Sequence, residues 1–265
     1  MNLIRRAIIF TTFIGFNSYA NVTIFKQWHL SPKQNTTDIA LSTKLPQYAN
    51  QENIYANVKK IILEGKSQLL IAEGCEGEID KNFKENFNGW DYTRLSTLKS
   101  SPDFDKILTL IPLKIEVLFG DKILTLCGDN KKLVNEHQLA LSDLRAYYGY
   151  ISRLSQFKGK DEKRYQEYSK ALGVPEGQDS ITFAKTKGQA ALATFKNLIL
   201  KRNDSFIEIA NKHKEQNPMI VIGGLHAEDL EKRLKEKGIE VSIIEDETYA
   251  KEEKGLFNQL EAAFK

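Results

Sequence analysis

A histidine, a glutamate and a second histidine each follow a run of apolar or β-branched residues, far apart in the sequence. His29 ends a β-branched run, and Glu73 closes an apolar one. His226 follows the apolar run at residues 219–222 and a pair of glycines. Imidazole and carboxylate groups bind divalent transition metals, and they also transfer protons near neutral pH. These residue types predict either a metal site or an acid-base site.

The segment around His226 predicts a buried strand, a tight turn and a helix. Three of the four residues at positions 219–222 are branched, and a helical apolar period begins soon after Gly223 and Gly224. In open α/β sheets, ligands bind beyond the carboxyl ends of the strands, where glycines let the backbone turn sharply and approach a bound group. We therefore expect Gly223 and Gly224 to support a site at His226. The alternative is that His226 only caps the helix or packs in the turn.

Three carboxylates, those of Glu73, Glu76 and Glu78, lie within six positions and are interleaved with glycine. A glutamate that closes an apolar strand is partly desolvated and has like-charged neighbours, so at least one carboxyl pKa should rise unless a cation neutralises the group. A bound cation is the simpler solution. Surface loops also carry glutamates for solubility, an interpretation that suits Glu76 and Glu78. Glu73, at the strand end, is expected to face the crevice.

Arg202 and Asn203 lie inside an apolar segment with helical periodicity. An arginine in such a segment can extend along the apolar surface to reach water. Its rigid guanidinium fork would also suit a substrate carboxylate or a developing oxyanion. Both interpretations of Arg202 stay open. His137 and His213 lie in charge-rich helical surroundings and are expected at the surface.

Strand-like runs alternate with helix-periodic segments along the chain, which is typical of α/β proteins with a parallel sheet. The expected strands are at residues 22–29, 68–73, 122–127, 219–222 and 239–244, and the expected helices are at 50–63, 103–119 with a break near Pro112, 131–157 and 181–214. We predict an α/β fold with a central, mostly parallel sheet, flanking helices and a helical insertion at about residues 131–215 that caps the strand ends.

Three of the candidate residues, His29, Glu73 and His226, lie at the end of an expected strand or shortly after it. Parallel strands deliver their carboxyl ends to the same edge, and neighbouring strands are ~4.8 Å apart, so side chains on distant strands cannot touch. We predict that the strands ending at His29, Glu73 and Gly223 are neighbours near the middle of the sheet. His29, Glu73, Arg202 and His226 should then meet at its carboxyl edge.

Residues 1–20 have the three parts of a secretory signal peptide. Arg5 and Arg6 supply the positive charge, an apolar stretch follows, and Ser18 and Ala20 place small residues at −3 and −1 of a cleavage site. The apolar stretch is shorter than the ~20 residues of a transmembrane helix. We expect cleavage near Ala20, export to the periplasm or the exterior, and no membrane span in the mature chain.

Removing the signal takes away two of the 38 basic residues and none of the 35 acidic ones, so the mature chain is nearly neutral. Such a chain has no electrostatic basis for binding nucleic acid. No linker or repeat interrupts residues 21–265, which are expected to form one domain. Cys75 and Cys127 are the only cysteines, and export would place them in an oxidising compartment. Whether they pair or stay as buried thiols is open at this stage.

Taken in order, these motifs resemble the TIKI/TraB/PrgY group. They are a histidine after the first strand, Glu73, an Arg-Asn pair in a helix, and Gly-x-x-His at residues 223–226 followed by a helix and a Lys-Gly-Ile segment. The group belongs to a superfamily that includes ChaN-like haem-binding lipoproteins and erythromycin esterases, whose members share a compact α/β fold. One departure occurs in the first motif, where Lys26 stands in place of the family's glycine.

The resemblance implies an exported metal-dependent hydrolase that acts on the amide bonds of a peptide or on a small molecule. His29 and His226 would be metal ligands, Glu73 a ligand or general base, and Arg202 the oxyanion or carboxylate clamp. The metal would be manganese, cobalt or zinc, and it would lower the pKa of a bound water. Lys26 puts the turn before His29, and with it the geometry of the metal site, in question.

Two alternatives belong to the same superfamily. One is a haem- or metal-binding protein without turnover, in which Tyr147, Tyr148, Tyr150 and His137 would be of interest, because tyrosine and histidine both ligate haem. The other is a metal-free hydrolase of the erythromycin-esterase kind, in which His29 acts as general base with Glu73.

Overall fold

The computed structural model describes residues 21–28, 43–45, 47–84, 90–108 and 111–265. In chain order, the elements are β1 (Asn21–Gln27), α2 (Gln47–Leu63), β2 (Leu69–Ala72), β3 (Glu76–Glu78), α3 (Tyr92–Thr97), the 3-10 turn η1 (Phe104–Lys106), α4 (Ile111–Phe119), β4 (Leu124–Gly128), α5 (Lys131–Phe157), α6 (Glu162–Leu172), α7 (Ser180–Lys212), η2 (Lys214–Gln216), β5 (Met219–Gly223), η3 (Gly224–His226), α8 (Ala227–Glu236), β6 (Glu240–Ile244) and α9 (Glu247–Phe264). The expected signal peptide lies outside the described residues.

The described strands form one six-stranded sheet in the order β3-β4-β2-β5-β1-β6. Every neighbouring pair is parallel except β3 and β4, which are antiparallel. The prediction of an α/β fold with a mostly parallel sheet is therefore confirmed. The strands that lead to Glu73, His226 and His29 are β2, β5 and β1, which lie side by side, so the prediction that they are neighbours is also confirmed.

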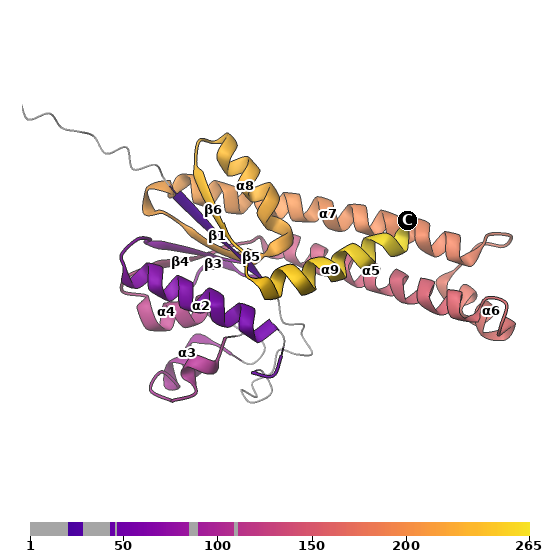
Figure 1. The fold of residues 1–265 in the computed structure, drawn as a ribbon, viewed down its shortest axis with the longest axis horizontal. Coiled ribbons are helices and arrows are strands. Elements are labelled where there is room, and N and C mark those ends of the chain that lie inside the picture. The colour runs from indigo at the N-terminus through magenta and orange to yellow at the C-terminus, as the bar shows by residue number, and fades with distance from the viewer. Residues whose placement is uncertain (1–20, 29–42, 46, 85–89, 109–110) are drawn as a thin grey trace, which may run out of the picture.

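Both faces of the sheet are buried under helices, with alternate strand residues facing each side (Figure 1). Val22, Ile24 and Ile222 point to one side, where they pack against α7 and α8. Phe25 and Val221 point to the other side, against α2 and α4. Each fully buried apolar side chain stabilises the fold by roughly 1.5–3 kcal/mol. The strands therefore lie in a core between two layers of helices.

Helices α5 and α7 form a long antiparallel pair that projects from the side where the strands end (Figure 1). The predicted helix at 131–157 is confirmed, and the one predicted at 181–214 spans Ser180–Lys212. Only the part of this pair nearest the sheet covers the strand ends, so the predicted cap is limited to that part. The rest of α5 and α7, together with α6, extends away from the sheet as a helical arm. Apolar residues of α5, α7 and α9 fill its core, among them Leu144, Phe195 and Phe264.

Two local predictions need correction. The acidic turn after Glu73 contains a short strand, β3, which pairs with β4. Pro112 does not break a helix, because it lies in the first turn of α4, where its missing N–H loses no hydrogen bond. Within the described ranges, no helix is both long and apolar enough to cross a bilayer.

Cys75 and Cys127 form a disulfide, which answers the question that the sequence left open. Their Cα atoms are 5.1 Å apart, because β2 and β4 are parallel neighbours and Ala72 is paired with Cys127. Cys75 follows β2 after a short turn and so returns to the same place on β4. The bond ties the β3 turn to the sheet close to Glu73.

A buried lysine joins α2, η1 and α4. Lys114 Nζ donates hydrogen bonds to the carbonyl oxygens of Phe104 (2.7 Å) and Asp105 (3.0 Å), and it lies 4.0 Å from the centre of the Tyr55 ring. The side chain has no exposed surface. Burial lowers the pKa of Lys114 to about 7, although the charge of Asp105 opposes the shift.

This lysine predicts a specific pH dependence of stability. An unfolded lysine keeps its proton up to a pH of ~10.4, whereas the folded one loses it above pH 7, so the unfolded state binds more protons between these values. The free energy of unfolding should therefore rise by about 1 kcal/mol per pH unit between pH 7.5 and 9.5. Urea denaturation of wild type and Lys114→Met measures this. An equal slope in both proteins would contradict it.

Candidate functional site

Helix α7 approaches the end of β4 unusually closely, and this brings Arg202 to the sheet. A Cβ atom at Gly128 would lie 2.3 Å from the ring of Phe206, so only glycine fits there. Phe206 lies one helical turn after Arg202. The close packing places Arg202 beside Asp129, the residue that follows β4, with only 3% of Arg202 exposed. Arg202 is therefore a buried residue of the site and does not extend to water.

All five N–H donors of Arg202 have an acceptor. Nε and Nη2 donate to the two carboxylate oxygens of Asp129 (2.8 and 2.7 Å), and Nη2 also donates to Oε1 of Glu73 (2.7 Å). Nη1 donates to Nδ1 of His137 (2.9 Å) and, at 3.4 Å, to Nε2 of His226. Burial disfavours the charge of Arg202, but the two carboxylates outweigh it and raise its pKa further above the usual range.

Glu73 connects the ends of two neighbouring strands. Its Oε2 accepts a hydrogen bond of 2.5 Å from the backbone N–H of Gly223, at the end of β5. Its Oε1 accepts from Arg202 and lies 3.5 Å from His226 Nε2. The side chain is 9% exposed, more than those of Arg202, Asp129 and His226. It is the member of the cluster nearest to solvent.

Asp129 belongs to the same cluster, although the sequence analysis did not select it. Besides both contacts with Arg202, its Oδ2 accepts a hydrogen bond of 2.6 Å from the backbone N–H of Gly74. Gly74 has a φ of 88°, which favours glycine, and this conformation directs its N–H at the carboxylate. Burial raises the pKa of Asp129, and the guanidinium of Arg202 opposes this shift.

The tautomer of His226 follows from a chain of hydrogen bonds. An ionised carboxylate only accepts, so Asp229 Oδ2 must face the amide nitrogen of Asn203, at 2.8 Å. The same nitrogen donates to the carbonyl oxygen of His226 (3.2 Å). The Asn203 oxygen then faces His226 Nδ1 at 2.7 Å, which requires the proton on Nδ1. Its Nε2 lies 3.4 Å from Arg202 Nη1 and 3.5 Å from Glu73 Oε1, and 2% of His226 is exposed.

Gly223 and Gly224, the glycine pair before His226, have different structural roles. Gly223 supplies the N–H that Glu73 binds. A Cβ atom at Gly224 would lie 1.9 Å from the hydroxyl oxygen of Tyr249, so glycine at this position lets α9 pack against the turn. This supports the expectation that the glycine pair permits a close approach. The group that approaches Gly224 is the side chain of Tyr249.

Glu73, Arg202 and His226 meet at the carboxyl edge of the sheet, as the strand order predicted. His29 lies outside the described residues. The chain just before it is held firmly, because Asn50 and Gln51 of α2 bind the backbone N–H and carbonyl of Trp28 at 2.7 and 2.8 Å.

Other candidate residues lie elsewhere or have a different environment. Glu76 and Glu78 are exposed on β3 and make no contact with Arg202. Lys26 continues β1 opposite Ile222 and forms an ion pair with Glu245, so the backbone does not turn there. The expectation that His137 is a surface residue is wrong, because it is 8% exposed and stacks on Phe195.

The described side chains of this cluster include two carboxylates, those of Glu73 and Asp129, and the guanidinium of Arg202, which binds both. Nε2 of His226 and Oε1 of Glu73 lie 3.5 Å apart beside this guanidinium.

These two atoms are spaced suitably for a shared metal ion. Ligands that hold one ion at ~2.0–2.2 Å are about 3–3.5 Å apart in tetrahedral geometry, and the observed separation is 3.5 Å. No set of three or more His, Cys, Asp or Glu side chains suited to a metal occurs within the part of the chain that the structure describes. The fit is therefore partial, with two of the ligands that the sequence analysis expected in place.

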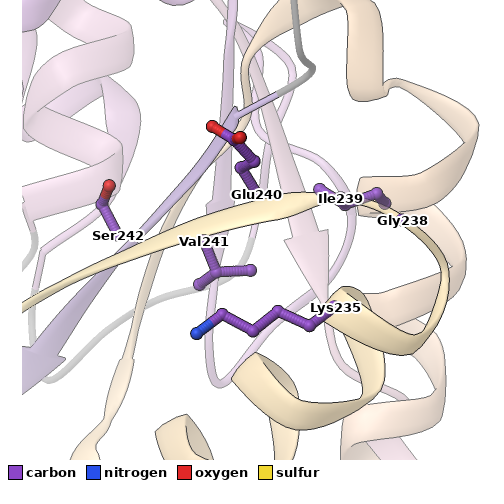
Figure 2. Close-up of a pocket in the computed structure, with 6 residues that line it drawn as sticks. All are labelled: Lys235, Gly238, Ile239, Glu240, Val241 and Ser242. Atoms are coloured by element: carbon purple, nitrogen blue, oxygen red, sulfur yellow. The ribbon is translucent and has the colours of Figure 1, made fainter.

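A hollow on the surface lies away from this cluster. Lys235 and residues 238–242 line it, where α8 ends and β6 begins (Figure 2). Glu240 is paired with Asn21 at the amino end of the parallel strands. The hollow is thus at the opposite edge of the sheet from Glu73 and His226, and its residues add nothing to their chemistry.

No protein-family model matches the sequence, and comparisons with curated proteins and with solved structures give no match. The resemblance to the TIKI/TraB/PrgY group stays a prediction that rests on short motifs. The geometry of the cluster is therefore the main basis for a functional proposal.

Proposed function

We propose that the protein is an exported hydrolase whose reactive pair is His226 and Glu73, with amide bonds of a peptide or small molecule as the target. The observation that carries this proposal is the buried contact between His226 Nε2 and Glu73 Oε1, 3.5 Å apart, beside Arg202 at the carboxyl edge of the sheet. Such a pair suits the activation of water. Export is supported by the Cys75–Cys127 disulfide, because these bonds persist in oxidising compartments.

In the first form of the proposal, His226 and Glu73 hold a divalent manganese, cobalt or zinc ion, with His29 as the expected further ligand. A bound ion of this kind supplies a coordinated water with a pKa lowered toward neutrality. Asn203 and Asp229 orient the His226 ring, as residues behind metal-binding histidines usually do. Gly223 fixes the other oxygen of Glu73 through its N–H.

A second form needs no metal, and one observation favours it. Arg202 already lies on Oε1 of Glu73 at 2.7 Å, the oxygen that a metal would use. In this form, His226 Nε2 takes a proton from water as a general base, and Glu73 stabilises the resulting imidazolium. Arg202 can contact a substrate only by releasing an existing hydrogen bond. The longest of its hydrogen bonds, at 3.4 Å, is the one to His226 Nε2.

The haem-binding alternative receives no support from the described geometry. His137 is buried and accepts a hydrogen bond from Arg202. Tyr150 packs edge-on against Tyr168 within the arm, with ring centres 6.4 Å apart. These side chains are used for packing and for the cluster.

A single assay separates the two forms. We expect the mature protein to hydrolyse members of an unbiased peptide library, and a strong chelator to abolish this if a metal is used. Adding manganese, cobalt or zinc at a hundred times its Kd should then raise the melting temperature by roughly 5–10 °C. Activity that survives the chelator selects the metal-free form. No hydrolysis, with or without added metal, would contradict the proposal.

A further inference from the structure

The two edges of the sheet differ in how well they are protected. At one edge, β3 has three residues, two of them glutamates, around Gly77, whose φ is 90°. Short strands, charges and local distortions are the usual means by which proteins keep an edge strand from pairing with another chain. At the other edge, β6 keeps an unbroken parallel register with β1, and residues 241–244 contain no charge and no proline. Among the described residues, β6 pairs with β1 alone, so its outer side is an unprotected edge.

The backbone groups of β6 that face outward follow from the hydrogen bonds of β1. The N–H of Thr23 donates to the carbonyl oxygen of Pro218, so Thr23 directs its backbone groups toward β5 and not toward β6. Ser242 is in register with Thr23, and in a parallel ladder the residue opposite such a position is the one that bonds across. Ser242 therefore faces β1. Because the direction alternates along a strand, the N–H and carbonyl groups of Val241 and Ile243 face away from β1.

The side chains along this edge leave room for a further strand. Figure 2 shows Val241 on the same side of β6 as Lys235, and Glu240 and Ser242 on the other side. Val241 and Ile243 pack against the core under α7 and α8 but stay partly exposed. The hollow between the end of α8 and β6 lies directly beside Val241. An additional strand could therefore extend the apolar layer on the α8 side.

A second copy of this chain matches this edge when its own β6 runs antiparallel. In an antiparallel pair, residues that exchange two hydrogen bonds alternate with residues that exchange none. Val241 of each copy and Ile243 of the other form two such bonded pairs, with both Ser242 residues on the two-fold axis. All the outward groups of Val241 and Ile243 are then used. Glu240 of one copy lies opposite Ile244 of the other, so no like charges oppose each other within the paired strands.

The charges at the two ends of β6 favour the same direction. Residues 231–238, just before the strand, include four basic and two acidic side chains, and residues 245–247, just after it, are all acidic. An antiparallel copy brings the amino end of each β6 beside the carboxyl end of the other. Opposite charges placed across an interface in this way promote association and fix the register.

We propose that the outer edge of β6 is a homodimer interface, at which two copies of the chain pair antiparallel, with Ser242 on the two-fold axis, to form one continuous sheet. Glu73 and His226 lie on other strands and take no part in the contact. The dimer therefore does not depend on the proposed hydrolysis, and its test needs no substrate.

An introduced cysteine tests the two-fold register. The native cysteines, Cys75 and Cys127, form a disulfide, so Ser242→Cys adds one free thiol to the chain. Antiparallel residues that exchange no hydrogen bonds have Cα atoms ~4.5 Å apart, within the ~4.4–6.8 Å range of disulfides. We expect mild oxidation of the full mature variant to yield mostly covalent dimer. Ser142→Cys, exposed on α5, is the control and should stay largely monomeric.

A proline tests the outward hydrogen bonds. Val241→Pro removes an N–H that faces outward and none that binds β1, and edge strands tolerate proline at such positions. By symmetry, the dimer loses two hydrogen bonds, so its Kd in analytical ultracentrifugation should rise about tenfold to a hundredfold. Val241→Ile keeps the N–H and should dimerise like wild type. If Val241→Pro does not fold, Ser242→Lys replaces it, because two lysines opposed on the axis should weaken the dimer most at low salt.

Three results would overturn the proposal. One is a wild type that stays monomeric at about 100 μM, where even a micromolar Kd gives mostly dimer. Another is cross-linking as extensive in Ser142→Cys as in Ser242→Cys. The third is a monomer in which the amides of Val241 and Ile243 are protected from hydrogen exchange, since another segment of the chain would then cover the edge. A dimer without hydrolytic activity would support the interface and contradict only the proposed function.

Discussion

Replacing Arg202 by methionine is expected to lower the free energy of unfolding by about 3–5 kcal/mol. The substitution leaves the carboxylates of Glu73 and Asp129 close together and largely buried, without the guanidinium that binds both. Breaking a buried charge network from one side is costly because the remaining charges stay desolvated. Urea denaturation at pH 7 measures the loss.

The matched control is Arg164→Met, which removes a largely exposed arginine paired with Asp161 at 3.5 Å. We expect a change of about 0–1 kcal/mol there. A second check uses pH, because protonating Glu73 and Asp129 removes their repulsion. The deficit of Arg202→Met should therefore shrink as the pH falls from 7 to 4.5. A deficit that is as small as that of the control, or that is constant with pH, would contradict this account.

Removing the disulfide should have an effect of similar size. Cys75 and Cys127 are 52 residues apart, and closing a loop of this length is worth about 4 kcal/mol in the chain-entropy view. The double variant Cys75→Ala, Cys127→Ala should lose about this amount in urea denaturation. Reduced wild type should behave like the double variant, and reductant should not change the double variant further.

The site should also respond to this change. Cys75 follows Gly74, whose N–H binds Asp129, so loosening the turn weakens one support of the Arg202 network. Turnover should therefore fall together with stability. A double variant as stable as oxidised wild type would show that the three-residue pairing of β3 with β4 holds the turn by itself.

The parts of the site that follow from strand topology could be predicted from the sequence. Glu73 and His226 end or follow apolar runs, and parallel strands bring their ends to one edge, so their meeting required only the correct strand order. The same rule, applied to Asp129 after β4, would have found the second carboxylate. Asp129 follows a glycine at the polar exit of its strand, where an aspartate is equally typical of a turn or of the helix start that follows.

The parts contributed by helices were harder to predict, because helical periodicity shows which face is buried but not what it is buried against. Arg202 could not be placed without knowing that Gly128 admits Phe206. His137 was expected at the surface because polar residues flank it. It lies in the buried stripe with Ala140 and Leu144, at spacings of three and seven residues, and this signal could have identified it.

The most direct test of the reactive pair is the turnover of Glu73→Gln in the peptide-library assay. Glutamine keeps the size of Glu73 and an oxygen for the N–H of Gly223, but it can neither stabilise an imidazolium nor act as a good metal ligand. We expect turnover to fall about a hundredfold or more at an equal folded fraction, while Glu76→Gln, an exposed neighbour on β3, leaves it unchanged. Equal turnover of Glu73→Gln and wild type would contradict the account.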